Sequence, residues 1–422
     1  MIIRAALASS DGIHVDRHFG ATEVFEIYEI DTISHTYEKI DRRTTCKACH
    51  EHVHNSDRLE KAIRTIEDCN TVFAAAVGYG ARAELIKYDI IPVETELSIW
   101  RITRGLAYGR MELPSLYEIK EKTRKSTITG NARNNLKKLQ NIHPCMGGDA
   151  HFKRGRIHLP VSPECNIQCK FCSRRMDKSV IRPGVTSLIL TPEETPDIIS
   201  KAKTLCPELS VVGIAGPGDT LASTKALETF ALVKKHHPEM VCCLSTNGFR
   251  LPDRIERIAE IGVETITVTV NAVDPEIEAK INNFVIDENG VKHEGIEGAR
   301  LLIEHQLQGI KRAAELGIVV KINSVLIPGI NNDHIPEVAR VTSELGASLL
   351  NIIPLIPQNE MADIPAPSTE LIQHVRAEAG KYLEIFMHCK HCRADSCGIP
   401  GQGQDLHGKL YDKEVAETFS HG

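Results

Sequence analysis

Cys165-Asn-Ile-Gln-Cys169-Lys-Phe-Cys172 lies near the middle of a chain of 422 residues. Three thiolates on such a short loop can each bind one iron of a 4Fe–4S cluster, which leaves the fourth iron without a protein ligand. An open iron can bind the amino and carboxylate groups of S-adenosylmethionine. One electron from the cluster then cleaves a C–S bond and gives a 5′-deoxyadenosyl radical. A closed zinc site is the main alternative. We favour the radical site because Phe171 precedes the last cysteine, a strand-like run at 156–162 comes before the motif, and βα units follow it.

Length, charge and cysteine content set the broad class of protein. The chain is long enough for two domains, one of them large. A net charge of −6 and a pI near 6.4 give no support to bulk binding of nucleic acid or of a membrane surface. We expect no secretory signal and no membrane span, because the N-terminus turns polar early and no run of about 18 apolar residues exists. Thirteen cysteines without an export signal favour metal or cluster ligands in a reducing compartment, and so a cytoplasmic protein.

Residues 1–100 are predicted to form a small α/β domain. Its hydrophobic pattern alternates as in strands in five places and follows a helical period in two. The expected strands are at 2–8, 24–30, 37–42, 71–77 and 91–94, and the expected helices are at 57–68 and 83–88.

Soft ligands gather between the third strand and the first helix of this domain, at Cys46, Cys49 and His50. The string matches a haem-attachment motif, but attached haem requires export, so we set haem aside. A metal or iron–sulfur contact is one interpretation, since thiolates and imidazoles lie within nine residues. A flexible polar loop with incidental thiols is the other.

Residues 101–142 are basic, and we expect a solvated linker there, with a docking surface for an acidic partner as the lesser alternative. Residues 401–422 read as a polar tail.

From residue 156 onward a short apolar strand, a loop and a helical stretch repeat. Strands are expected at 156–162, 209–215, 240–245, 265–270, 318–325 and 349–353, and helices at 223–236, 253–261, 297–316 and 335–345. This order predicts parallel pairing with right-handed crossovers, and therefore a partial or complete (β/α) barrel.

In a (β/α) barrel, chemistry takes place at the carboxyl ends of the strands, where the special residues of this chain fall. A glycine-rich turn lets backbone approach a ligand closely, and a carboxylate beside it can take an ammonium group. An ordinary βα turn is the alternative for that stretch. The candidate ligand-binding residues are Phe171, Gly216, Pro217, Gly218, Asp219, Ser245, Thr246, Asn247 and Asn271.

Cysteines also flank the barrel. Cys389 and Cys392 form a Cys-x-x-Cys pair at its end, and His143 and Cys145 precede the central motif. Either set can ligate an iron–sulfur cluster or a structural zinc, since both bind cysteine and histidine.

Together these residues resemble the NifB family, the radical S-adenosylmethionine maturases of nitrogenase cofactors. The resemblance covers about residues 143–400, and residues 1–100 resemble the NifX-type carrier domain, which in the familiar fused form follows the barrel. The shared motifs are HPC at 143–145, CNIQCKFC at 165–172, RPGV at 182–185, GIAGPGD at 213–219, LSTNG at 244–248, KINSVLIPGIN at 321–331, NIIPLIP at 351–357 and CKHCRAD at 389–395.

The resemblance implies a specific activity. In that family two further 4Fe–4S clusters lie beside the radical cluster, and one S-adenosylmethionine gives a methyl group to a cluster sulfide. A second molecule yields the radical that removes hydrogen from that methyl carbon, and the clusters fuse around a carbide. By resemblance, His143 and Cys145 help to hold one substrate cluster, and Cys389 and Cys392 the other.

This chain departs from the family at two positions. Lys178 stands where the family has a cysteine, and Val180 where it has a glutamate. A lysine cannot ligate iron as a thiolate does, so the first substrate cluster lacks one ligand. Cys397 is a candidate replacement, since the family usually has an apolar residue there.

We therefore expect a radical enzyme that assembles or remodels an iron–sulfur cofactor of nitrogenase or a nitrogenase-like reductase. The implied cofactors are a 4Fe–4S cluster, S-adenosylmethionine and one or two additional 4Fe–4S clusters. The implied partners are a cluster donor, a nitrogenase-type acceptor or carrier, and an electron donor such as ferredoxin or flavodoxin. A radical enzyme with another substrate and a cluster scaffold without catalysis are the alternatives.

Overall fold

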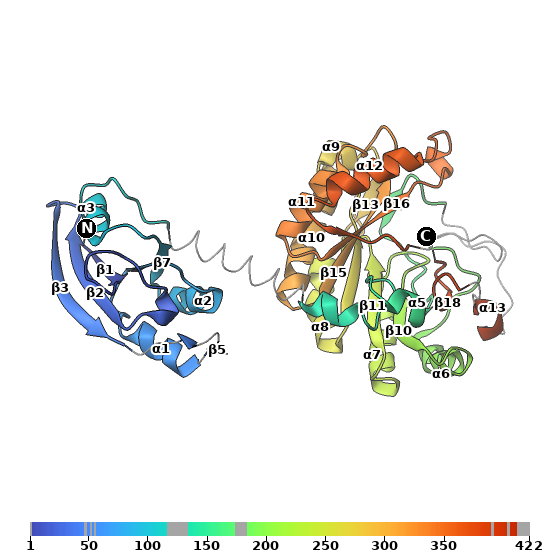
Figure 1. Cartoon of the computed structure of the whole chain (residues 1–422). Helices are drawn as coiled ribbons and strands as arrows, with labels where there is room; N and C mark the ends of the chain where they lie inside the picture. The colour runs from blue at the N-terminus through green and yellow to red at the C-terminus, as the bar shows by residue number, and fades with distance from the viewer. Residues whose placement is uncertain are drawn as a thin grey trace. The chain divides into compact units, whose positions relative to one another are not determined.

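The computed structural model describes residues 2–45, 49–50, 53–54, 56–115, 134–173, 184–389, 392–402 and 406–411. The chain divides into two compact units, Met1–Ser126 and Thr127–Gly422 (Figure 1). In the described part of the chain, no helix combines the length and the apolar character that crossing a bilayer requires.

The first unit is built on a five-stranded sheet with the order β3-β2-β1-β6-β7. Strands β1 and β2 pair antiparallel, as do β2 and β3, whereas β6 is parallel to both β1 and β7. The strands are β1 (Ile2–Ala8), β2 (Val24–Asp31), β3 (Thr36–Thr44), β6 (Thr71–Ala74) and β7 (Ile91–Glu94). A separate antiparallel pair follows β3, formed by β4 (Cys49–His50) and β5 (Val53–His54). All five strands that the sequence predicted for this unit are therefore present.

Helices cover both faces of this sheet, because side chains along a strand point alternately to opposite faces. Ala6 and Ala8 of β1 lie in one apolar cluster with side chains of α1 (Ser56–Arg64) and α2 (Tyr79–Lys87). Leu7 lies in the other cluster, with α3 (Ile99–Ala107).

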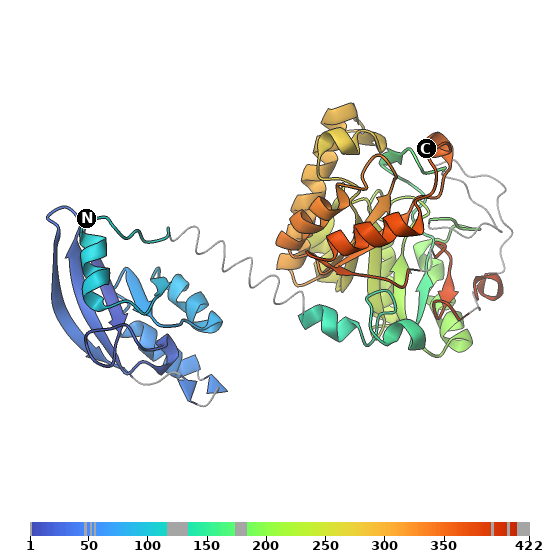
Figure 2. The ribbon, with the colours of Figure 1, turned by 45° about the horizontal axis from the view of Figure 1, so that its top comes forward.

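The second unit contains an eight-stranded sheet with the order β17-β16-β15-β12-β11-β10-β8-β18 (Figures 1 and 2). All neighbours pair in parallel except β18, which runs antiparallel to β8. The strands are β8 (Gly155–His158), β10 (Leu209–Ile214), β11 (Val241–Thr246), β12 (Thr265–Thr269), β15 (Val319–Leu326), β16 (Leu349–Pro354), β17 (Glu384–Ile385) and β18 (Cys397–Gly398). Since β17 and β18 end the sheet without pairing with each other in the described residues, the fold is a partial (β/α) barrel.

Helices pack on the outer face of this sheet, and the apolar core lies between the helices and the sheet. Helix α6 contacts α7, α7 contacts α8, and α8 contacts α10, while α11 contacts α12. These helices are α6 (Thr195–Leu205), α7 (Lys225–His236), α8 (Leu251–Ile261), α10 (Gly295–Glu315), α11 (Ile335–Glu344) and α12 (Thr369–Ala379). The sequence predicted four of them and missed α6 and α12.

A small three-stranded sheet, which the sequence did not predict, lies beside the cysteine motif. Strand β9 (Ile167–Cys169) pairs antiparallel with β13 (Asn282–Ile286), and β13 pairs with β14 (Lys292–Glu294). The short helix α9 (Pro275–Glu278) leads into β13. Because β9 belongs to the motif itself, this sheet fixes the cysteine loop to the segment after β12.

Both ends of the segment that we expected to be a linker, residues 101–142, pack into one unit or the other. Helix α3 joins the first apolar core through Ile102 and Leu106. Leu136 and Leu139, in a helical stretch at 134–139, pack against inward side chains at the amino ends of the barrel strands.

Candidate active site

A cavity of about 360 Å³ lies inside the partial barrel. Strand alternation places the even-numbered residues of the central strands, such as Val212 and Leu244, in the outer core, and the odd-numbered residues inward. The inward strand residues that line the cavity are Val211, Gly213, Cys243, Ser245, Thr267, Thr269, Lys321, Asn323, Val325, Asn351 and Ile353. Several of them are polar, so hydrogen-bonding groups face the cavity from the strands.

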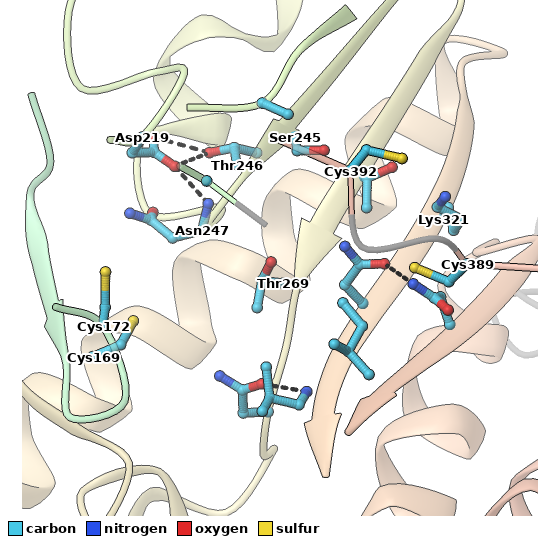
Figure 3. A pocket seen from close by; sticks show the side chains of 18 of the residues that line it. Cys169, Cys172, Asp219, Ser245, Thr246, Asn247, Thr269, Lys321, Cys389 and Cys392 are labelled. Carbon is cyan, nitrogen blue, oxygen red and sulfur yellow. Dashed lines mark hydrogen bonds between the residues drawn. The ribbon is translucent and has the colours of Figure 1, made fainter. Parts of the chain in front are cut away.

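Six of the cysteines that the sequence singled out line this one cavity, and they come from three separate stretches of chain. Cys165, Cys169 and Cys172, here called the loop group, lie on the motif loop. The residues here called the inner group are His143, Cys145, Cys243, Cys389 and Cys392. In Figure 3, Cys169 and Cys172 lie on one side of the pocket, and Cys389 and Cys392 on the other.

Hydrogen bonds on both flanks hold the backbone of the loop group. The Lys170 amide donates to Ile281 O at 2.9 Å, and the Lys170 ammonium group donates to Ala279 O at 3.2 Å. From the other flank, the Asn359 side-chain amide donates to Lys170 O at 3.1 Å and to Cys172 O at 3.2 Å. With the backbone held in this way, the three thiol side chains line the cavity.

The glycine-rich turn after β10 packs directly on the start of the motif. Gly218 donates to Ser162 O at 2.8 Å, and a Cβ atom at Gly218 would lie 2.0 Å from Glu164 O, so no side chain fits there. Gly216 has a φ of +114°, a conformation that only glycine adopts without strain. This turn therefore needs its glycines to bring the backbone against the cysteine loop.

Asp219 is 4 % exposed and connects the turns after β10 and β11 (Figure 3). Its carboxylate accepts hydrogen bonds from Asn247 N at 2.6 Å, Leu221 N at 2.9 Å and the Thr246 hydroxyl at 2.9 and 3.1 Å. Burial raises the pKa of Asp219, and these hydrogen bonds oppose that rise. Most of its acceptor capacity is used within the protein. The predicted contact with a ligand ammonium group stays a prediction.

All of the predicted ligand-binding residues except Gly216 line the cavity. The Asn247 side-chain amide donates to Asn166 Oδ1 at 2.7 Å and so links the turn after β11 to the cysteine loop. Asn271 accepts from Val325 N at 2.9 Å and connects β12 with β15. Ser245 lies on the inner face of β11, and Phe171 both lines the cavity and packs against a small apolar cluster.

Within the inner group, His143 is fully buried and adjoins Cys145. The Cys145 amide donates to Nδ1 of His143 at 3.0 Å. The buried Nε2 of His143 has no partner among the residues described. Burial, with Lys321 and two other nearby cationic groups, lowers the pKa of His143 to about 3, so the ring is neutral. The neutral ring carries its proton on Nε2, and that proton would have to leave before Nε2 binds a metal ion.

Cys243 is a member of the inner group that the sequence analysis missed. Burial raises the pKa of its thiol to about 11, while Thr265 and Lys321 oppose the rise and a charge on Cys145 adds to it. Cys145 and Cys243 therefore lie close enough to interact. Position 243 could have been found from the inward alternation of β11, where Cys242 points into the outer core.

The segment around Cys389 and Cys392 is fastened to β8. Arg156 donates to the Cys392 thiol, and the Arg156 guanidinium donates to Gly398 O at 3.1 Å. Burial raises the pKa of Cys392, with Cys145 and Cys389 adding to the rise and Arg156 opposing it. Cys145 and Cys392 thus lie near enough for a charge on Cys145 to affect the pKa of Cys392.

A buried ion pair anchors the same segment. Arg393 and Asp395 pair at 2.8 Å, and the Asp395 carboxylate also accepts from Ser187 N at 2.7 Å. Cys397, the candidate replacement ligand, packs in the outer apolar core and does not line the cavity. It is therefore in no position to supply a ligand there.

Glu278 is a second cavity residue that the sequence analysis missed. Its carboxyl accepts a hydrogen bond from the Asn282 side chain, and Oε2 is buried with no partner among the described residues. Burial raises the pKa of Glu278 to about 7. It ends α9, next to the backbone that supports the cysteine loop.

Several predicted residues lie outside what the structure shows. Cys46 is outside the described residues, as are Lys178 and Val180, and for Cys49 and His50 only the backbone is described. In the described ranges, no three His, Cys, Asp or Glu side chains converge to hold a single metal ion. A 4Fe–4S cluster does not require its ligands to converge on one point, because each cysteine binds a different iron.

Two family models match the chain. A model described as the radical SAM superfamily matches residues 159–341. A model described as dinitrogenase iron-molybdenum cofactor matches residues 1–100. The first covers β10, β11, β12 and β15 together with the cysteine loop, and the second covers the five-stranded sheet.

Curated relatives carry one shared description, FeMo cofactor biosynthesis protein NifB. The protein from Methanocaldococcus infernus is 46 % identical over 283 residues, which are 67 % of this chain and 90 % of that protein. The protein from Methanocaldococcus jannaschii is 43 % identical over 62 % of this chain and 87 % of its own length. The protein from Azotobacter vinelandii is 39 % identical over 63 % of this chain and 54 % of its own length.

Among solved structures, a radical SAM methyltransferase from Sphaerobacter thermophilus matches 55 % of this chain and 65 % of that one, with a TM-score of 0.42 and 19 % identity. SuiB of Streptococcus suis, solved with S-adenosylmethionine bound, matches 89 % of this chain and 72 % of that one, with a TM-score of 0.40 and 14 % identity. From the curated relatives and the two family models together, the chain belongs to the NifB family of FeMo cofactor biosynthesis proteins, as a radical SAM enzyme that carries an N-terminal NifX-like domain.

Proposed function

We propose that this enzyme builds an iron–sulfur cofactor precursor inside the barrel and uses S-adenosylmethionine both as the radical source and as the donor of the carbide carbon. The observation that carries the proposal is the single cavity lined by both the loop group and the inner group. A radical formed at one group then needs no passage through solvent to reach a substrate held at the other.

The loop group would hold the resident 4Fe–4S cluster. Its donor set fits, because the three thiol side chains line the cavity from a backbone that hydrogen bonds hold on both flanks. When bound, that cluster supplies the electron that cleaves S-adenosylmethionine. The turns after β10 and β11 and the inner face of β12 provide the polar side chains that orient the ligand, namely Ser245, Thr246, Asn247 and Thr269.

The inner group would hold the iron–sulfur substrate. His143, Cys145 and Cys243 supply one set of soft ligands, and Cys389 and Cys392 supply another. Cys145 lines the same cavity as Cys243 and Cys392, and a charge on it would raise the pKa of both, so substrate held by the two sets would meet in one space. Cys243 gives the first set a third ligand that does not depend on position 178.

The N-terminal unit would receive the product from the barrel and pass it to a nitrogenase-type acceptor. It belongs to the same chain as the barrel, and covalent linkage raises the effective concentration of a carrier near the site where the product forms. Its candidate ligands, Cys46, Cys49 and His50, are soft donors, and an incomplete set of soft donors suits capture and release better than permanent binding. A cluster donor and an electron donor such as ferredoxin or flavodoxin would complete the set of partners.

The test is anaerobic reconstitution of the full chain with iron, sulfide, S-adenosylmethionine and reductant, with 5′-deoxyadenosine and S-adenosylhomocysteine assayed together. We expect both products, because methyl transfer leaves S-adenosylhomocysteine and radical formation leads to 5′-deoxyadenosine. Formation of 5′-deoxyadenosine alone would indicate a radical enzyme with a different substrate. Absence of both would contradict the proposal.

A further inference from the structure

Lys321 is a buried cation on the inner face of β15. Its side chain is in the cavity lining, and the residue is 6 % exposed. Its Nζ donates to Cys145 O at 3.1 Å and lies 4.9 Å from the centre of the Phe386 ring. Over the ranges that the structure describes, no carboxylate forms an ion pair with it.

A buried charge without a counter-ion is costly, because the protein interior replaces little of the solvation that water gives. A carbonyl oxygen and an aromatic face offset part of that cost but leave a net positive charge. Proteins retain such a charge where a bound ligand supplies the opposite one. Lys321 therefore indicates that an anion occupies the cavity beside it.

The surroundings of Lys321 show what kind of anion fits. Its charge acts on both His143 and Cys243, so it lies among the first set of soft ligands. In Figure 3 it lies on the side of the pocket that carries Cys389 and Cys392, away from Cys169 and Cys172. An anion in this place would be surrounded by sulfur and imidazole ligands.

Arg156 brings a second buried cation to the same group. It is 5 % exposed, lines the cavity and donates to the Cys392 thiol. The inner group thus has a fixed positive charge beside each of its two ligand sets. Among the described residues that line the cavity, Lys321 and Arg156 are the lysine and arginine side chains. Lys170, on the cysteine loop, donates to a backbone carbonyl and does not line the cavity.

We propose that Lys321 is a positioning residue whose ammonium group, together with Arg156, binds the anionic iron–sulfur substrate of the inner group and stabilises its reduced form. This inference rests on the proposed function. Sulfide and thiolate ligands give an iron–sulfur cluster net negative charge, and each added electron increases it. A fixed cation in a site of low dielectric therefore favours the reduced state and lessens the repulsion between two clusters brought together.

The experiment compares midpoint potentials in the reconstituted full chain by anaerobic redox titration followed by electron paramagnetic resonance. Lys321→Met keeps the length of the side chain and removes its charge. We expect the ratio of reduced to oxidised substrate cluster at a fixed potential to fall by about tenfold, which is about 59 mV for a one-electron couple. Lys321→Arg should restore the wild-type ratio. The potential of the loop-group cluster in the same sample should stay unchanged.

The matched control is Lys235→Met, which removes an exposed lysine from the outer helix α7. If Lys321→Met disturbs the fold, so that the loop-group cluster is lost as well, Lys321→Gln carries the same test. Gln keeps a hydrogen-bond donor on a slightly shorter side chain and removes the charge.

The outcomes separate this inference from the function on which it rests. If the wild-type protein binds only enough iron for one cluster, both the proposed function and the role of Lys321 are overturned. Wild-type protein with additional clusters whose potentials are equal in the Met, Gln and Arg variants would overturn only the role of Lys321. A shift in the uncharged variants that Arg reverses supports the inference, because a packing defect alone would not follow the charge.

Discussion

The two ligand groups of the cavity are built in different ways. The loop group comes from eight consecutive residues, Cys165 to Cys172, and backbone hydrogen bonds hold it from both flanks. The inner group comes from residues 143 to 392, and its members lie on a turn before β8, on strand β11 and in the C-terminal segment. Among the described residues of the cavity lining, the buried cations Arg156 and Lys321 both accompany the inner group.

This difference indicates a division of work. A ligand set on one short, fixed loop suits a cofactor that stays in place through every turnover. Ligands from several elements, with positive charge beside them, suit an anionic substrate that enters, changes and leaves. Glu278 is a buried acid near the support of the cysteine loop, and burial raises its pKa to about 7, so below that pH it adds no fixed charge beside the loop group. The predictions that follow test whether the two groups act separately.

The largest effect is expected from Cys169→Ala. Loss of one thiolate leaves one iron of the resident cluster without its protein ligand, so formation of 5′-deoxyadenosine should fall below detection. The measurement is product formation under anaerobic conditions with excess reductant. The control is Cys206→Ala, a cysteine of the outer core that should behave as wild type. Turnover of Cys169→Ala at the wild-type rate would sink the assignment of the loop group.

Replacement of both Cys389 and Cys392 by alanine should affect only the inner group. We expect the iron content to fall by about one cluster's worth, while the resonance spectrum of the loop-group cluster is retained. Iron analysis and electron paramagnetic resonance on the same sample make the comparison. Cys397→Ala is the control, since that side chain does not line the cavity. Tightly bound zinc in the wild type, with no loss of iron in the variant, would instead identify a structural zinc site.

Glu278→Gln should change how stability depends on pH. Burial raises the pKa of Glu278 from 4.5 to about 7, so between these values the folded state holds a proton that the unfolded state has lost. Stability therefore falls as pH rises through this window, by about 3 kcal/mol in total at about 1.4 kcal/mol per pKa unit. In Glu278→Gln this contribution should be absent, so the variant should gain stability relative to wild type between about pH 4 and about pH 8, a range that spans the window.

The measurement is denaturant unfolding of the full chain, prepared without added iron, at both pH values. Glu276→Gln, on the same helix and exposed, is the control and should keep the wild-type dependence. Equal pH dependence in Glu278→Gln and wild type would mean that the carboxyl is ionised when folded and adds a fixed charge beside the loop group.

The smallest effect on the chemistry is expected from removal of residues 1–115. The cut includes α3, because that helix packs its apolar face on the first sheet. Cleavage of S-adenosylmethionine should be essentially unchanged, whereas transfer of the product to an acceptor should fall. Rates of 5′-deoxyadenosine formation and of cofactor transfer measure the two effects. A folded but inactive barrel would show that the N-terminal unit takes part in catalysis.

The parts of this molecule that could be predicted from sequence are those fixed by local pattern. The six central strands of the barrel and the loop group follow from hydrophobic runs and from one short motif. Cys243 and Lys321 were missed because their importance depends on which face of a strand turns inward. The alternation in Val-Lys-Ile-Asn at 320–323 separates the two faces of the strand. Which face turns inward becomes clear only from the barrel, where one face packs on helices and the other lines the cavity.

Other features depend on contacts between distant segments. The pairing of β9 with β13 joins Cys169 to Asn282, and no pattern in the sequence near either residue predicts this pairing. Asp219 was expected to bind a ligand ammonium group, yet the turn after β11 brings Thr246 and Asn247 to its carboxylate. A short polar side chain beside a glycine can form hydrogen bonds within the protein or bind a ligand, and the sequence does not distinguish these two roles.

The central claim is that one cavity holds a resident cluster at the loop group and a separate iron–sulfur substrate at the inner group. Mössbauer spectroscopy of the full chain reconstituted with isotopically enriched iron, before and after S-adenosylmethionine is added, tests it most directly. We predict at least two populations of iron, of which only the loop-group population changes when S-adenosylmethionine binds its open iron. A single population that changes as a whole would contradict the claim.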